Sequence, residues 1–214
     1  SSANVENVSR IAGEDRIATS IEISKAMFNE SDNVVLASGF NFADALSAGQ
    51  LAAALNAPLI LSNDQLDSRT SDEITKLKPK NMYIVGGENA LGSNIEESVK
   101  SVVNDINIER LKGNDRYETS VKVMEKTKEF VDAEYLLIAS GKNFPDALSA
   151  TSFMADHKAL MVLSDGNSYP KSDLQEIAIG GVNQLPLNGF TGERIAGNDR
   201  YQTALAIACL LYTS

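Results

Sequence analysis

The 214-residue chain contains one cysteine, one histidine and no tryptophan. A single cysteine excludes an intramolecular disulfide framework and a thiolate metal cluster. No apolar run approaches the roughly 18 residues that a membrane-spanning helix requires, so we expect no membrane span. No signal peptide precedes Ser1, and this start is compatible with a mature secreted terminus, a cytosolic terminus or a cut.

Basic residues are also scarce, with 19 lysines and arginines against 29 acidic residues and a net charge of −10. This balance argues against nucleic acid and against an anionic membrane surface as general partners, although it permits a local basic patch. The hydrophobic share of 43% is ordinary for a soluble globular protein. The length allows one large domain or two of about a hundred residues.

Two phrases recur along the chain. ASGFNFADALSA at 37–48 returns as ASGKNFPDALSA at 139–150, with ten of twelve positions identical. A second phrase occurs three times, as RIAGEDRIATS from Arg10, RLKGNDRYETS from Arg110 and RIAGNDRYQTA from Arg194. The spacing is too long for a helical solenoid, so each copy is a domain-sized unit. We therefore predict a first repeat at 9–108, a second at 109–192 and the start of a third at 193–208.

The pattern inside each unit predicts an α/β fold. In the first unit, continuous apolar runs at 34–38, 58–62 and 82–87 alternate with segments of helical spacing. Such strands indicate a parallel sheet covered on both faces. We therefore expect tandem small domains, each with a parallel, doubly wound sheet.

Two parts of the chain depart from this plan. The second unit is shorter between Ser164 and Gly180 than the first unit is over the matching stretch, so we expect its C-terminal half to be shortened. The last six residues, CLLYTS, read like a translated sequencing adaptor, and we expect 209–214 to be a non-native tail.

Catalytic chemistry finds little support in the sequence. The lone histidine, His157, has Leu55 at the matching position of the first unit, and we expect it to be a surface substitution. The first unit has neither histidine nor cysteine, so a Ser/His/Asp or Cys/His nucleophile cannot be assembled there. The HExxH pattern is absent as well. We expect no catalytic residues, no metal and no cofactor.

Each copy of the three-fold phrase places an aspartate where it can cap a helix, followed by an arginine. A cation in the first helical turn is mildly unfavourable, so its threefold occurrence suggests another partner. That partner could be an internal carboxylate such as Asp44 or Asp146, the surface of another unit, or an anionic ligand held in bidentate fashion. The pairs are Asp15-Arg16, Asp115-Arg116 and Asp199-Arg200.

The duplicated Asn-Phe-x-Asp phrase is expected to form a turn. Asp44 and Asp146 are predicted N-caps, and Phe42 and Phe144 are predicted to plug the turn. The Gly86-Gly87 pair follows a strand, where it predicts a tight turn or, alternatively, a phosphate-binding helix start. The pair lacks the GxGxxG spacing of a dinucleotide site.

Taken together, RIAGNDRYxTA, ASGxNFPDALSA, APLILS and YIVGG resemble the cell wall binding repeat 2 family of Gram-positive, clostridial-type surface proteins. The resemblance covers nearly everything from Arg10 to Ala208. It implies three repeats with Toprim-like or Rossmann-like sheets, packed with pseudo-threefold symmetry. It also implies secretion and non-covalent anchoring of the protein to the cell wall through an anionic secondary wall polymer.

The resemblance also implies site residues. The polymer-binding set is Arg10, Arg16, Arg110, Arg116, Arg194 and Arg200 with Pro58, Leu59, Ile60 and Leu61. The motif positions with structural roles are Asp15, Asp115, Asp199, Asn41, Asp44, Asn143, Asp146, Gly86 and Gly87. Two alternatives remain: the wall-targeting part of an N-acetylmuramoyl-L-alanine amidase whose catalytic domain lies outside this chain, and a nucleotide- or phosphate-binding α/β protein.

Overall fold

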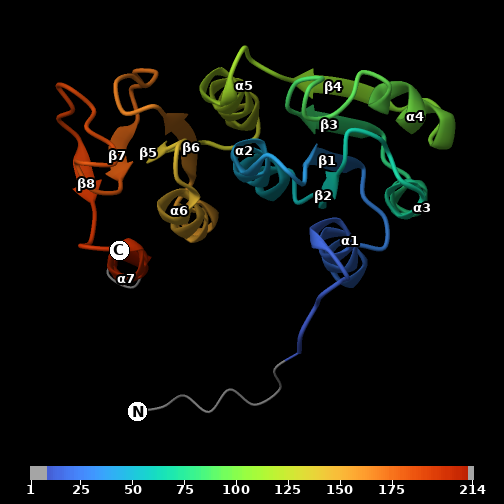
Figure 1. Cartoon of the computed structure of the whole chain (residues 1–214), viewed down its shortest axis with the longest axis horizontal. Coiled ribbons are helices and arrows are strands. Elements are labelled where there is room, and N and C mark those ends of the chain that lie inside the picture. Colours follow the sequence, from blue (N-terminus) through green and yellow to red (C-terminus); the bar gives the residue numbers. More distant parts are fainter. Residues whose placement is uncertain (1–8, 212–214) are drawn as a thin grey trace.

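The computed structural model describes residues 9–211, which form two four-stranded parallel sheets (Figure 1). The first sheet has the order β2-β1-β3-β4, and the second has the matching order β6-β5-β7-β8. The strands of the first are β1 (Asn33–Ser38), β2 (Leu59–Ser62), β3 (Asn81–Val85) and β4 (Asn107–Leu111). Those of the second are β5 (Tyr135–Ser140), β6 (Ala159–Ser164), β7 (Gln175–Ile179) and β8 (Glu193–Ile195). The predicted tandem α/β fold is confirmed.

Helices cover both faces of the first sheet because its central strand is apolar on both sides. Val34 and Leu36 of β1 pack with α1 (Arg16–Met27), α3 (Ser68–Leu77) and α4 (Ile95–Val102). The alternate residues Val35 and Ala37 pack with α2 (Phe42–Ala54) on the opposite face. The period of two along a strand thus sends successive side chains into two separate cores.

The second sheet is covered by α5 (Arg116–Lys128) on one face and by α6 (Phe144–Asp156) with α7 (Arg200–Leu211) on the other. Residues 165–174 and 180–192 contain no helix, where the first repeat has α3 and α4. Leu185 and Leu187 from the second of these segments fill the core beside α5 instead. The second repeat is therefore shorter, and loop side chains cover the face of its sheet that α3 and α4 cover in the first repeat.

The sheets do not coincide with the sequence repeats. The predicted boundary at 108/109 falls inside β4, which belongs to the first sheet. β8 opens the predicted third repeat, yet it belongs to the second sheet. The three-fold phrase that contains two arginines, called the Arg-rich phrase below, thus begins as the last strand of a sheet in its second and third copies and continues into the helix that follows, α5 or α7. The repeat boundaries stay a prediction, as does the non-native tail at 209–214, part of which lies outside the described residues.

One helix joins the two repeats. α2 lies between the sheets beside α5, and it also contacts α6 and β6 (Figure 1). The Gln50 side chain of α2 donates to the Met161 carbonyl at 2.9 Å and accepts from the Met161 N–H at 3.0 Å. Because β6 is the edge strand of its sheet, this amide satisfies backbone groups that would otherwise lack a partner.

Candidate functional site

The three Arg-rich phrases fold into the same turn. In each copy a threonine hydroxyl accepts from a glycine N–H, at 3.1 Å for Gly13, 2.9 Å for Gly113 and 3.0 Å for Gly197. A Cβ at these glycines would lie 2.5, 2.2 and 2.3 Å from the following helix, so no side chain fits. The glycine and threonine positions of the motif are therefore set by local packing.

The aspartates of the phrase cap the helices that follow, as predicted. Asp15 accepts from the Ala18 N–H at 2.7 Å, and Asp115 accepts from the Glu118 N–H at 2.9 Å. Asp199 accepts from the Gln202 N–H at 2.8 Å. Each carboxylate satisfies a backbone donor that the first helical turn leaves open.

The first arginine of the phrase is a structural clamp in two of the three copies. Arg110 donates to Glu96 at 2.8 Å and to the carbonyls of Gly86, Leu91 and Gly92 at 3.2, 2.9 and 3.3 Å. Its side chain is only 8% exposed. Arg194 donates to the Gly180 carbonyl at 2.7 Å, and burial lowers its pKa. Both guanidinium groups hold the glycine-rich loop after the third strand of a sheet.

In the first two copies, the second arginine of the phrase lies at the end of the first strand of its own repeat. Arg16 donates to the Gly39 carbonyl at 2.8 Å, and Arg116 donates to the Gly141 carbonyl at 2.9 Å. The Arg16 guanidinium lies 5.2 Å from the centroid of Phe40, within its own repeat. The Arg116 guanidinium lies 5.4 Å from that of Phe42, which belongs to the preceding repeat. The second arginine therefore bridges two repeats in the second copy, at Arg116, and remains within one repeat in the first copy, at Arg16.

The prediction that Asp44 and Asp146 are N-caps is wrong. α2 begins at Phe42 with Asn41 as its N-cap, and α6 begins at Phe144 with Asn143 as its N-cap. Both aspartates lie inside the first helical turn and point to the glycine pair of their own repeat. A Cβ on Gly86 would lie 2.8 Å from an Asp44 carboxylate oxygen, and one on Gly180 would lie 2.8 Å from Asp146.

Asp44 and Asp146 lie at the topological switch point of their sheets, where the strand order changes direction. After β1 the chain passes to one side to form β2 and then to the other side to form β3; β5, β6 and β7 repeat this order. Ligands of open α/β sheets bind outside the carboxyl ends of the strands at this point. Gly86 and Gly180 adopt φ of +118° and +113°, which allows the loop to pass beneath the carboxylate.

Burial raises the pKa of Asp44 to about 6, against the opposing effects of the nearby Arg116 charge and of the Asn41 amide, which donates to Asp44 at 2.7 Å. Burial also raises the pKa of Asp146, and the charge of Arg200 opposes that rise. The same relationship thus occurs twice, with an aspartate of one repeat facing the arginine that opens the next. Of the partners left open by the sequence, the surface of another unit is the one that Arg116 contacts, through the Phe42 ring of the preceding repeat. Asp44 and Asp146 interact with Arg116 and Arg200 through charge, and neither aspartate forms an ion pair with its arginine among the described residues.

A polar cleft of about 500 Å³ lies at the second of these positions. Its lining combines Asn143, Asp146 and Gly181 of the second repeat with Asp199 and Arg200 of the phrase that follows. Asn183, Gln184 and Asn198 add further amide groups. Carboxylate, amide and guanidinium groups are donors and acceptors for hydroxyl and acidic groups, so the cleft has the chemistry to bind a polar ligand.

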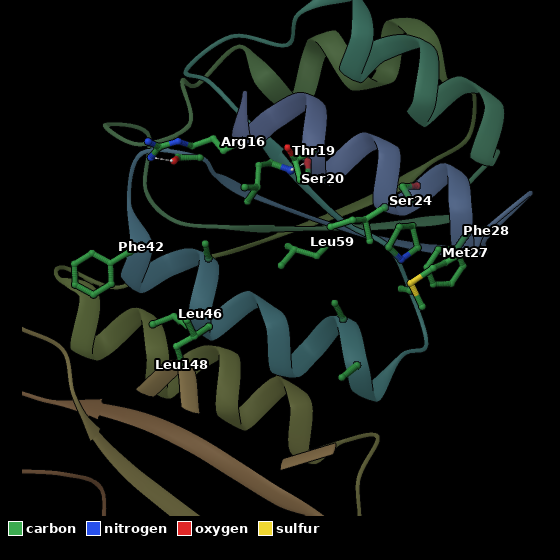
Figure 2. A pocket seen from close by; sticks show the side chains of 18 of the residues that line it. Arg16, Thr19, Ser20, Ser24, Met27, Phe28, Phe42, Leu46, Leu59 and Leu148 are labelled. Atoms are coloured by element: carbon green, nitrogen blue, oxygen red, sulfur yellow. Dashed lines mark hydrogen bonds between the residues drawn. The ribbon is translucent and has the colours of Figure 1, made fainter. Parts of the chain in front are cut away.

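The Pro58–Leu61 segment lies elsewhere. Ile60 is fully buried and Pro58 is buried, whereas Leu59 and Leu61 are half-buried in an apolar groove of about 840 Å³ between α1 and α2. Figure 2 shows this groove with Arg16 at one end and Met27 and Phe28 at the other. It is separate from the polar cleft.

Several contacts at the junction of the repeats and in the core could not be predicted from the sequence patterns. Gln50 joins the repeats, but nothing marked it because the matching position of the second repeat carries a different residue. His157, predicted to be a surface position, is partly buried and stacks on Phe153 with ring centroids 4.2 Å apart. Phe42 and Phe144 contact each other across the junction at 5.6 Å, although Phe144 remains exposed.

The described residues contain no helix long and apolar enough to cross a membrane. Over residues 9–211, histidine, cysteine, aspartate and glutamate side chains nowhere gather in the groups of three or more that could hold a metal ion.

Comparison with curated proteins finds relatives connected with the bacterial cell wall. The N-acetylmuramoyl-L-alanine amidase LytC of Bacillus subtilis is 30% identical over 215 residues, covering 94% of this chain and 42% of LytC. The amidase enhancer of the same organism is 30% identical over 210 residues, covering 93% of this chain and 29% of the relative. The chain therefore spans less than half the length of both.

Two solved structures are similar to this chain in fold. Cwp6 from Clostridium difficile matches with a TM-score of 0.85 and 27% identity, over 100% of this chain and 38% of that protein. Cwp8 from the same organism matches in fold with a TM-score of 0.81, over 92% of this chain and 36% of that protein, at 24% identity. The family model described as Cell wall binding domain 2 matches residues 10–96 and 110–188, so the chain belongs to the cell wall binding domain 2 family.

Proposed function

We propose that this module anchors a secreted protein non-covalently to the Gram-positive cell wall by binding an anionic secondary wall polysaccharide at the junctions between repeats. The observation that carries the proposal is the convergence of motif residues from successive phrases in one polar cleft, where Asn143 and Asp146 meet Asp199 and Arg200. Membership of a cell wall binding family supports the target.

The cleft has groups suited to a charged sugar polymer. Arg200 supplies a guanidinium that can hold a phosphate or carboxylate in bidentate fashion. The amides of Asn143, Asn183 and Asn198 can exchange hydrogen bonds with sugar hydroxyls. The net charge of −10 confines attraction for an anion to such local positions and disfavours unspecific adsorption.

Repetition strengthens weak contacts. The Asp146/Arg200 pair has a counterpart in Asp44 and Arg116 at the preceding junction. When two similar positions on one rigid body contact one polymer, the second contact forms at a high effective concentration. A polysaccharide with regularly repeated charges would therefore bind more tightly than a single charged sugar.

The proposed contact set is narrower than the one predicted from the family resemblance. It keeps Arg16, Arg116 and Arg200 and leaves out Arg110 and Arg194, whose guanidinium groups hold internal loops. Ile60 is fully buried, so it has no surface to offer a polymer. Pro58 is buried at the wall of the apolar groove between α1 and α2. Leu59 and Leu61 line an apolar groove, which suits contact with another repeat better than contact with a polysaccharide.

We also propose that other repeats of the same chain are partners of this module, in a pseudo-threefold arrangement. The packing of α2 against the following repeat and of α6 against α7 supports a regular head-to-tail order. Similarity to the amidase LytC favours one alternative, in which the module is the wall-targeting part of a peptidoglycan amidase with its catalytic domain outside this chain. The two proposals share the binding role of the residues described here.

Co-sedimentation with purified Gram-positive cell walls tests the arginines. The double variant Arg116→Gln/Arg200→Gln is expected to bind at least about tenfold more weakly, since each lost charged contact is worth about 1 kcal/mol or more. The matched control is Lys25→Gln/Lys80→Gln, which removes two exposed lysines that form ion pairs with Glu22 and Asp32. Equal binding by both variants would contradict the proposed contact set.

A further inference from the structure

The two places where a glycine loop meets an Arg-rich phrase share one backbone frame. At the first junction, the Gly86 N–H donates to the Leu111 carbonyl at 3.0 Å. At the second junction, the Gly180 N–H donates to the Ile195 carbonyl at 2.8 Å. Each bond ties the loop after the third strand of a sheet to the phrase that follows. The two junctions can therefore be compared residue by residue.

Opposite charges bridge the first junction, and neutral side chains replace them at the second. Glu88 follows the first glycine pair and forms an ion pair with Lys112 of the phrase. The matching positions of the second junction are Val182 and Ala196, and both are exposed. An ion pair between the loop and the phrase is therefore impossible at these positions of the second junction.

A further acid is also confined to the first junction. Glu118 accepts from the Asn114 N–H at 2.9 Å and from the Asn114 side-chain amide at 2.8 Å. Its counterpart Gln202 accepts from the Asn198 N–H at 3.0 Å. The backbone contact is thus kept while the charge is lost. The side-chain amide of Asn198 forms no hydrogen bond within residues 9–211.

The asparagines that cap the helices α2 and α6 differ in the same way. The Asn41 amide donates to the Asp44 carboxylate at 2.7 Å. Asn143 is exposed, and its side chain forms no hydrogen bond in the part of the chain that the structure describes. Asn143 and Asn198 both line the polar cleft of about 500 Å³. Two amides that are occupied at the first junction are therefore free to bind a ligand at the second.

The distribution of charge favours the second junction for an anion. Each junction has two aspartates and one arginine in matching places, and the arginines are Arg116 and Arg200. The first junction adds two glutamates and one lysine, so it carries one more negative charge than the second. Because Lys112 is already paired with Glu88, it adds little attraction for an anion. Like charges near a binding arginine weaken its attraction for an anionic partner.

We propose that the second junction is the principal site for an anionic polysaccharide, and that Glu88, Lys112 and Glu118 restrict the first junction to a weaker contact. A charged sugar would be held at Arg200 by the guanidinium and by the unbonded amides beside it. The first junction would then add a second contact to a chain that is already bound. This inference rests on the proposed polymer binding and specifies which junction provides most of it.

An opening variant gives the first junction the side chains of the second. It is Glu88→Val/Lys112→Ala/Glu118→Gln, and because all three positions are exposed, little change in stability is expected. The probe is polysaccharide released by acid from purified Gram-positive walls, and NMR follows the amides of Gly87 and Gly181. In the parent chain we expect the larger shift at Gly181. In the opening variant the shift at Gly87 is expected to become as large.

The control for the opening variant is Glu30→Gln. It makes the same change in net charge at an exposed residue that precedes β1, at the amino end of the strands, whereas the junctions lie at the carboxyl ends. Glu30→Gln is expected to leave the small shift at Gly87 unchanged. An equal gain at Gly87 in the control and in the opening variant would overturn the role of the three exchanged residues.

A closing variant makes the reverse exchange, Val182→Glu/Ala196→Lys/Gln202→Glu. It is expected to bind the polysaccharide at least about fivefold more weakly than the parent, because Val182 lines the cleft and a carboxylate there repels an anion. Lys80→Gln, at an exposed residue before β3, makes the same change in net charge and is expected to bind like the parent.

The outcomes separate this inference from the proposed function. Equal shifts at Gly87 and Gly181 in the parent, or a closing variant that binds as well as Lys80→Gln, would overturn the inference and leave the binding role intact. Binding to intact walls with no shift at either glycine would overturn it as well. A parent chain that binds neither the polysaccharide nor the walls would contradict the proposed function and this inference together.

Discussion

Gln50 and Met161 are 111 residues apart in sequence and are joined by two hydrogen bonds, one in each direction between the side-chain amide and the strand backbone. The pair is buried at the junction of two repeats. It fixes the register of α2 against the edge of the second sheet, and thereby the orientation in which the motifs of successive repeats meet.

Removing this amide tests the junction. Gln50→Ala is expected to destabilise the chain by about 2 kcal/mol, because the Met161 N–H and carbonyl would remain buried without partners. Denaturant unfolding measures the change. Gln175→Ala, at an exposed position, is the control and is expected to stay within about 0.5 kcal/mol of the parent. Similar losses for both variants would contradict a specific role for Gln50.

The glycine pair after β3 offers a matched comparison of two neighbouring residues. Gly86→Ala is expected to cost about 2–3 kcal/mol, because φ is +118° and the new Cβ would lie 2.8 Å from Asp44. At Gly87 a Cβ meets nothing within 4 Å, so Gly87→Ala is expected to be nearly neutral. Thermal unfolding measures the stability of the two variants. Equal stability would contradict the close approach of the Asp44 carboxylate to Gly86.

Asp44 predicts a pH dependence of stability. Its pKa is raised to about 6 in the folded chain, from an ordinary value of 3.8. A raised folded-state pKa means that the contribution to stability is fully present below pH 3.8 and is lost as the pH rises through about 6. Asp44→Asn is therefore expected to stabilise the chain at pH 7.5 by about 2 kcal/mol.

The same variant should lose its advantage in acid. Because asparagine resembles the protonated acid, the stability difference between Asp44→Asn and the parent should shrink as the pH falls below about 6 and should approach zero below pH 3.8. Urea titrations at pH 4, 5, 6 and 7.5 follow this trend. A difference that is independent of pH would show that Asp44 does not titrate as described.

Substitution of Arg110 tests whether this arginine has a structural role or binds the polymer. Arg110→Lys is expected to cost about 2–3 kcal/mol, because a single ammonium cannot replace a fork that reaches Glu96 and the loop carbonyls of Gly86 and Leu91. At temperatures where the variant stays folded, its wall binding should be unchanged. A variant that keeps the stability of the parent but binds cell walls more weakly would contradict this expectation and would show that Arg110 contacts the polymer.

Secondary structure that depends on neighbouring residues was predictable from the sequence, whereas contacts between residues far apart in the sequence were not. Alternating apolar runs predict a parallel sheet, and the N-cap role of Asp15 follows from its place before a helical pattern. The start of α2 was misjudged because Asn41 and Asp44 are both good capping residues three positions apart. Only the contact of Asp44 with Gly86, 42 positions further along the chain, distinguishes a carboxylate at the switch point from a cap.

The roles of the arginines depend on the same non-local information. The repeated phrase marks Arg110 and Arg116 equally, because a sequence repeat preserves structural and binding residues alike. Arg110 proves to be buried among loop carbonyls, while Arg116 reaches across to Phe42 and Asp44 of another repeat. The two differ in which segments the fold brings to them, and no local pattern carries that difference.

The proposed binding role is tested most directly by co-sedimentation of the chain with Gram-positive cell walls before and after acid extraction of their secondary polymer. The account predicts binding to intact walls that weakens from low to high salt, as a screened ionic contact does, and that disappears with the polymer. Undiminished binding to the extracted walls would contradict it and would point to peptidoglycan itself as the ligand.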